Sequence, residues 1–200
     1  MRPSDERLIA RLQERNADRK RATDDGTHPR KAVPPVAATA LRTAEHAIGF
    51  KVPELLRAIY LKVGNGGVGP EYGIVGTKGG AKLDGCTLET GYRSMAKLAR
   101  ENPVWRWPER LLPLANYGCG MWSCVDCEYR TLPMILWDSD NLDSDLTAAD
   151  ARLNWGNSFW DQRLAFRAWL EGWLAGKPEP EPEWPSDAWM RKRLGFTLPK

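Results

Sequence analysis

The sequence predicts helices packed on a β-sheet, with the strands concentrated near the middle of the chain. Residues 111–138 contain three short apolar runs, separated by Asn, Gly, Pro and charged residues. Runs of this length with such boundaries are typical of consecutive strands. Helical periodicity precedes this stretch, and a thick apolar helical stripe follows it. The ten tryptophans supply a core, because each can bury on the order of 200 Å².

Four helices are predicted before the strands. The first, residues 4–22, has an apolar stripe of only Leu8, Ile9 and Leu12, so we expect its first half to dock on the body or on another chain. Residues 24–35, with Asp-Gly and several prolines, predict a linker. Apolar residues at helical spacing predict further helices at 38–48, 53–63 and 88–100. Gly49 is expected just past the end of one helix, and Thr87 is expected to cap another.

The C-terminal part predicts one more strand at residues 151–155 and a long helix from 157 to about 175. The helix has a thick apolar stripe, which we expect to cover one side of the sheet. Alternating prolines in residues 177–185 exclude a helix and predict a stiff, extended segment. Residues 186–194 predict a last short helix.

Charge and hydropathy exclude several classes of protein. The net charge is +3, but residues 1–32 hold nine Lys or Arg against six Asp or Glu, so the remaining 168 residues sum to zero. Composition therefore gives no basic patch on the folded body, and we expect no specific nucleic-acid partner. No apolar run approaches the roughly 18 residues of a membrane span, and the charged N-terminus is unlike a signal peptide. We expect a cytoplasmic protein.

Three segments together resemble one family. Residues 44–67 read AEHAIGFKVPELLRAIYLKVGNGG, which is a helix, Gly-Phe-x-x-Pro, and a second helix ending in Asn-Gly-Gly. Residues 111–126, LLPLANYGCGMWSCVD, are similar to a central strand pair, and residues 157–170, NSFWDQRLAFRAWL, to a closing Ser-Phe helix. In this order they resemble the SUKH superfamily, which includes the yeast cell-wall-assembly regulators of the Smi/Knr type. The likeness covers residues 38–175.

The resemblance implies an α+β fold with a curved, mostly antiparallel sheet of about four to six strands, backed by helices. Residues 36–176 would form this domain, residues 1–35 an N-terminal helix and linker, and residues 177–200 a Pro/Glu-rich tail. It also implies that many bacterial members are immunity proteins, which bind and neutralise a toxin, often a nuclease. It implies no shared catalytic residues.

The cysteines raise the question of a metal. Cys119, Cys124 and Cys127 have the spacing of the first three ligands of an iron–sulfur loop, and Cys86 could supply a fourth ligand for zinc or iron. Against this, Cys119 and Cys124 point to opposite faces if both lie in strands, and only one CxxC unit exists. We expect free cysteines and no cofactor, and keep a zinc- or iron-stabilised regulatory domain as the alternative.

Catalytic groupings do not stand out. The only histidines are His28, in the predicted linker, and His46, which faces away from its helix stripe, so no cysteine has a nearby base. The Gly-rich residues 64–69 follow a helix rather than a strand, unlike a dinucleotide-binding turn. The acidic residues 138–145 fit the calcium-loop pattern in neither of two frames. We expect a protein that is not an enzyme.

The sequence therefore favours a binding module, most simply an immunity protein for a bacterial toxin. Exposed carboxylates would face a basic toxin surface and speed association. The candidate contacts are Asp138, Asp140, Asp143 and Asp145. Trp122 or Trp137 would add an aromatic anchor if exposed. In the competing interpretation, the aspartates only solvate a turn and both tryptophans belong to the core.

Overall fold

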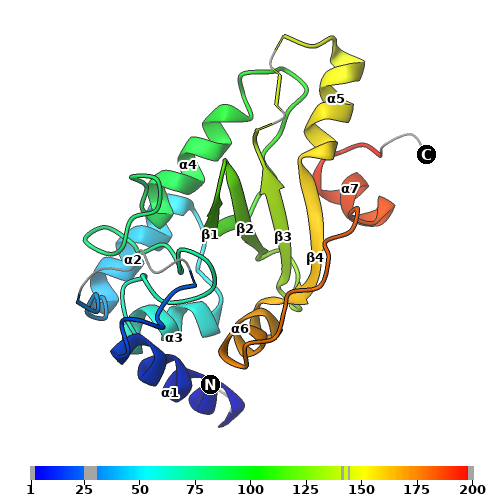
Figure 1. Ribbon diagram of the computed structural model, residues 1–200. Coiled ribbons are helices and arrows are strands. Elements are labelled where there is room, and N and C mark those ends of the chain that lie inside the picture. The colour runs from blue at the N-terminus through cyan, green and yellow to red at the C-terminus, as the bar shows by residue number, and fades with distance from the viewer. Residues whose placement is uncertain (1–2, 25–30, 141, 144, 198–200) are drawn as a thin grey trace.

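The computed structural model describes residues 3–24, 31–140, 142–143 and 145–197 (Figure 1). Three helices precede the Gly-rich segment and a fourth follows it: α1 (Pro3–Ala17), α2 (Ala38–Ile48), α3 (Glu54–Lys62) and α4 (Leu88–Leu98). The strands are β1 (Leu111–Gly118), β2 (Met121–Asp126), β3 (Pro133–Asp138) and β4 (Phe159–Ala165). Helices α5 (Ala148–Asn157), α6 (Phe166–Leu174) and α7 (Asp187–Arg193) complete the described chain. None of the described helices has the length and apolarity to cross a membrane.

The strands form one open antiparallel sheet in the order β1-β2-β3-β4. In the register, Trp122 on β2 lies opposite Trp137 on β3, which lies opposite Phe159 on β4. Because side chains alternate along a strand, these three rings share one face of the sheet. The α+β class and the antiparallel sheet predicted from the sequence are confirmed.

Most of the predicted N-terminal elements are confirmed. Helix α2 ends at Gly49, whose φ of 91° is left-handed and suits glycine. Helix α4 begins at Thr87, which forms a reciprocal capping box with Thr90. Helix α1 ends at Ala17, earlier than the predicted residue 22. Its stripe of Leu8, Ile9 and Leu12 is buried, and α1 contacts α3 and α6, so this helix docks on the body.

The predictions for residues 151–175 are partly wrong. Residues 151–155 belong to helix α5. Thr147 caps the N-terminus of this helix, because its side chain accepts a hydrogen bond from the Asp150 amide. Residues 159–165 form strand β4 instead of the first half of a long helix. The reason is tertiary, because β3 would otherwise be an edge strand with unpaired backbone groups, and β4 supplies its partners. The predicted apolar stripe lies on a helix only from Phe166 onward.

A cluster of aromatic rings covers the face that carries Trp137 and Phe159. The central ring is Trp155 of α5, which stacks on Trp105 with centroids 5.1 Å apart and meets Phe159 edge-on at 5.2 Å. Trp107 packs edge-on against Trp137 at 5.1 Å. We call this group of rings the tryptophan cluster, and its members are Trp105, Trp107, Trp137, Trp155, Phe159 and Trp189. All six are buried.

A buried ion pair attaches the C-terminal helix to this core. Asp126, at the end of β2, is fully buried, and its two oxygens accept hydrogen bonds from Arg193 Nε at 2.9 Å and Nη2 at 3.0 Å. Trp189 Nε1 donates to the same carboxylate at 2.9 Å. Arg193 also donates to the Glu109 carbonyl. Helix α7 is therefore held by a two-point charge contact as well as by its apolar side chains.

Replacing Arg193 by Met should lower the free energy of unfolding by about 3 kcal/mol, because it leaves the Asp126 carboxylate buried without its charge partner. The matched control is Lys192→Met on the same helix, where the side chain is 51% exposed and lies 3.5 Å from Glu128. That change should cost about 0.5 kcal/mol or less. Urea unfolding followed by tryptophan fluorescence measures both values. Equal losses for the two variants would show that the buried pair does not hold α7.

Candidate partner-binding surface

The acidic residues 138–145 link β3 to α5 on the surface of the molecule. Asp140, Asp143 and Asp145 are exposed, and Asp138 is half-buried at the end of its strand. This acidic loop, described at residues 138–140, 142, 143 and 145, therefore presents three carboxylates to solvent and a fourth at its base. The structure brings these four predicted residues into one segment of surface.

Local hydrogen bonds hold the acidic loop in shape. The amide of Asp140 donates to Asp138 Oδ1, and the amide of Asp145 donates to Asp143 Oδ1, both at 2.9 Å. Asn154 of α5 accepts from the Asp143 amide at 3.1 Å. These turns arise because an aspartate side chain readily caps the backbone two residues ahead. The backbone at Asp140, Asp143 and Asp145 is thus held by these hydrogen bonds, one of which joins Asp143 to α5.

The loop also rests on the β1–β2 turn. Ser139 Oγ donates to the Gly120 carbonyl at 3.1 Å. A Cβ atom at Gly120 would lie 2.5 Å from Asp140 Oδ1, and the φ of Gly120 is 68°, so only glycine fits here. Gly120 of the β1–β2 turn therefore also makes room for the acidic loop.

The two predicted aromatic anchors are not on this surface. Trp122 and Trp137 lie opposite each other on β2 and β3 and are both buried. A partner that docks on the folded chain does not reach them. Trp122 and Trp137 were predicted as anchors only if exposed, and they are not exposed. Their alternation with Ser123 and Leu136 places them on the face covered by the tryptophan cluster.

The Gly-rich segment after α3 is a compact structural loop organised by Asn65. The buried side chain of Asn65 accepts from the Thr77 amide at 2.8 Å, and its carbonyl accepts from the Ala81 amide at 2.9 Å. A Cβ atom at Gly80 would lie 2.4 Å from Asn65, so this approach requires glycine. The amides of Gly67, Gly73 and Gly76 donate to carbonyls within residues 70–81, which leaves them unable to cradle a phosphate. Residues 72–75 and 81–83 lie outside the four strands of the sheet.

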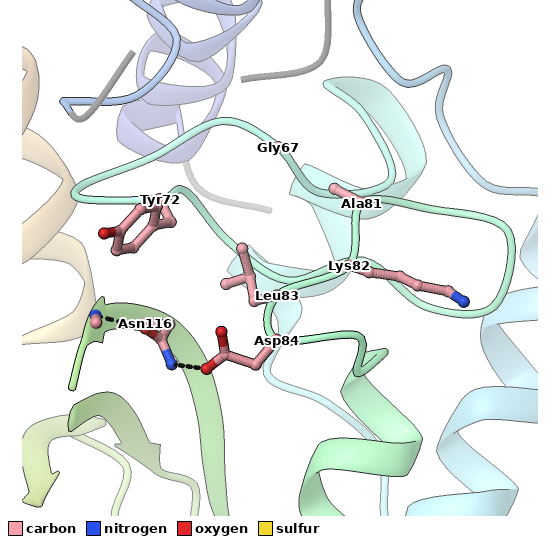
Figure 2. A pocket seen from close by; sticks show the side chains of 8 residues that line it. Gly67, Tyr72, Ala81, Lys82, Leu83, Asp84 and Asn116 are labelled. Carbon is pink, nitrogen blue, oxygen red and sulfur yellow. Dashed lines mark hydrogen bonds between the residues drawn. The ribbon is translucent and has the colours of Figure 1, made fainter. Parts of the chain in front are cut away.

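A hollow of about 400 Å³ lies between this Gly-rich loop and β1 (Figure 2). Asn116 Nδ2 donates to Asp84 Oδ2 at 2.6 Å, and the Tyr72 ring lies on the same side of the hollow as Asn116. The Lys82 side chain extends away from Asp84. The residues that line it are Gly67, Tyr72, Ala81, Lys82, Leu83, Asp84, Asn116 and Gly118. This lining holds one carboxylate, already bonded to an amide, no His or Cys, and one lysine whose side chain extends away from that carboxylate.

The four cysteines are all free, and they sit in different environments. Cys119 is exposed in the β1–β2 turn, Cys86 is half-buried in the loop before α4, and Cys124 and Cys127 are buried at the far end of β2. In the described part of the chain, no three His, Cys, Asp or Glu side chains are grouped so as to hold a metal ion. Cys86, Cys119, Cys124 and Cys127 therefore do not form the ligand set of the alternative interpretation. His28 lies outside the described residues.

Burial also makes the inner thiols poor nucleophiles. Desolvation, with a smaller effect of the nearby Asp126, raises the pKa of Cys127 to about 12. The pKa of Cys124 is raised well above its ordinary value for the same reasons in the same order. Both thiols therefore stay protonated at neutral pH and donate weakly to carbonyls of their own strand.

Comparison with known families decides the relationship. Residues 35–152 match the model of the SMI1 / KNR4 family (SUKH-1). The chain belongs to this family. Neither a comparison with curated proteins nor one with solved structures gives a match.

The SUKH-1 match and the folded unit have different limits. The matched residues include α2 to α4 and the first three strands, and end within α5. Strand β4 and helices α6 and α7 lie beyond them, yet they complete the sheet and share one hydrophobic core with α1. In this SUKH-1 protein the segments that flank the matched residues are therefore structural parts of the same core.

Sequence reasoning missed one surface feature. Trp160 of β4 and Trp184 of the Pro-rich tail form a ring pair with centroids 4.5 Å apart. The helix predicted over residues 157–175 does not place the Trp160 side chain on the outer surface, so this pair was not predicted. Residues 159–165 show no alternation of apolar and polar side chains, so the sequence holds no local signal for a strand with Trp160 on its outer side.

Thiol labelling at pH 8 should separate the cysteines. Cys119 should react rapidly with an aromatic disulfide reagent, and Cys124 and Cys127 should react only after denaturation, because they are buried and protonated. A Cys119→Ser variant should lose the fast phase and keep the rest. Rapid labelling of Cys127 in the folded protein, located by mass spectrometry, would contradict this assignment.

The same burial predicts alkaline destabilisation. The folded chain raises the pKa values of Tyr60, Tyr117, Cys124 and Cys127, chiefly by desolvation. The unfolded chain releases these protons at lower pH, so stability is complete below about pH 9 and falls as the pH rises toward 12. Urea unfolding at pH 8, 9.5 and 10.5 measures the fall, and Tyr60→Phe should make it shallower. A stability that is flat over this range would disprove it.

Proposed function

We propose that this protein is a non-catalytic binding module that neutralises a bacterial toxin by covering its functional surface, as an immunity protein does. Membership of the SUKH-1 family supports this, since the superfamily resemblance implies that many bacterial members are immunity proteins. The observation that supports the proposal is the acidic loop. The backbone amides of Asp140, Asp143 and Asp145 donate hydrogen bonds to neighbouring side chains, and the three carboxylates are exposed.

The chemistry of the loop favours a basic partner. Three exposed aspartates within six residues produce a local negative potential on a body whose charges sum to zero. A toxin that acts on nucleic acid has a positively charged substrate groove, which such a loop would meet with complementary charge. Occlusion then follows from contact alone and needs no catalytic group on this chain.

The first test of this function measures whether the chain protects cells from a toxin and binds it. The protein encoded by the neighbouring gene is expressed with and without this chain, and growth is measured. Wild-type protein should restore growth and should bind the purified neighbour in a pull-down. A chain that neither binds nor protects against any neighbouring toxin would remove the immunity role.

Neutralising the loop should slow association with that toxin. The triple variant Asp140→Asn, Asp143→Asn and Asp145→Asn removes the charge, and the new amide oxygen at position 143 can still accept the hydrogen bond from the amide of residue 145. The association rate should fall by about tenfold at low salt and less at high salt, because screening removes the steering term. The matched control neutralises two exposed acids of α1 and one just after it, namely Glu6→Gln, Glu14→Gln and Asp18→Asn. Stopped-flow fluorescence measures the rates, and equal effects of both triples would argue against the loop.

A further inference from the structure

One pair of large rings remains on the surface of a chain that buries most of its tryptophans. Trp184 is 50% exposed, and the half-buried Trp160 lies beneath it with the ring planes 32° apart. Among the described residues, the exposed large hydrophobic side chains are Trp184 and Leu153, the latter 40% exposed on α5. An isolated exposed side chain is ordinary, but two contacting indoles form a larger apolar patch.

The pair is held in place by a strap, which we define as residues 177–185. The strap leaves α6 and runs along the outer edge of β4 to α7 (Figure 1). Asp161 and Glu183 exchange two backbone hydrogen bonds of 2.7 and 2.9 Å. The prolines of the strap restrict its backbone, so little conformational entropy remains to be lost on binding. Trp184, next to Glu183, is thus displayed on a fixed segment.

A second contact anchors the strap on the sheet. The Glu179 carboxylate accepts hydrogen bonds from Trp169 Nε1 at 2.7 Å, Tyr117 Oη at 2.9 Å and Gln162 Nε2 at 3.2 Å. Burial, with Glu179 as the second cause, raises the pKa of Tyr117, so the phenol keeps the proton that it donates. Four elements, β1, β4, α6 and the strap, therefore meet at one carboxylate.

The register places the indole pair beside the acidic loop. Trp160 lies opposite Leu136, and Asp138 lies two residues further along β3, so all three side chains project from the same face. This is the face opposite to the tryptophan cluster. Leu136, Asp138 and Trp160 are each only half-buried, as is Met121, which lies opposite Asp138. The ring pair and the base of the acidic loop form one continuous surface.

Charge around the pair has one dominant sign. Glu181 and Glu183 of the strap are exposed within three residues of Trp184. The nearby Arg163 is engaged with Glu183 at 2.9 Å. An aromatic patch bordered by carboxylates suits a cationic side chain, because the ring faces attract the charge and the acids neutralise it.

We propose that Trp160 and Trp184 form the aromatic anchor of the partner-binding surface and receive an arginine or lysine side chain of a basic protein partner. The proposal rests on the function proposed above. It assigns the equilibrium affinity for the partner to the tryptophan pair and the association rate to the acidic loop. Tryptophan is the residue type most enriched among energetically dominant contacts, and here it sits on a rigid support.

Substitution in the full chain tests the anchor against the neighbouring-gene toxin. Trp184→Ala should weaken the equilibrium affinity by about 30-fold or more, the size of a dominant contact, mainly through faster dissociation. The control Leu153→Ala removes the other exposed large apolar side chain and should change affinity less than about twofold. Thermal unfolding checks that both variants remain folded. Equal effects of the two substitutions would overturn the proposal while leaving toxin binding intact.

A second measurement needs no toxin, so the two proposals can fail separately. The wild-type chain is titrated with a peptide of alternating arginine and glycine, and with the same peptide carrying neutral citrulline. Saturable shifts of the Trp160 and Trp184 indole N–H signals in NMR are expected with the arginine peptide alone. Buried Trp105 should not shift, and Trp184→Ala should abolish the response. No shift at either indole, or equal shifts with citrulline, would overturn the anchor.

Discussion

Packing of indole rings on one face of the sheet is the interaction on which the rest of this structure depends. Trp155 sits between Trp105 and Phe159, and it can do so only if residues 148–157 form a helix over the sheet. That helix delivers the chain to the free edge of β3, where β4 pairs. Trp189 then brings α7 against Phe159, and the Asp126–Arg193 pair fastens it. The order of the C-terminal elements thus follows from the tryptophan cluster.

Concentrating apolar rings on one face gives the opposite face a different character. There, polar groups from four elements meet at Glu179, and the strap crosses the edge of the sheet at Asp161. Half-buried side chains of β3 and β4 continue from this network to the acidic loop. The division separates the parts that hold the SUKH-1 domain together from the parts available to a partner. The two buried cysteines, Cys124 and Cys127, belong to the structural part, since they lie beside Asp126.

Local patterns predicted the elements whose causes are local. The stripes of α2 and α3, the glycine after α2, the Thr87 cap and the three consecutive strands were all expected. Residues 157–175 were misassigned because Phe166, Trp169 and Trp173 show helical spacing that was extended backward over β4. The acidic loop was predicted as a surface feature, whereas Trp122 and Trp137 were offered as anchors that the sheet buries. No local pattern distinguishes a core tryptophan from a surface one.

The sequence by itself determined the family, the α+β class, the position of the central strands and the negative charge of the loop after Trp137. These follow from residue order, turn residues and composition, which act over a few residues. The tertiary structure alone decided that Phe159–Ala165 is a strand and that Glu179 joins the strap to Tyr117. It also decided that Trp160 and Trp184 meet outside the core. The physical reason is that these outcomes depend on pairing and packing between segments far apart in the chain, whose strength exceeds local propensity.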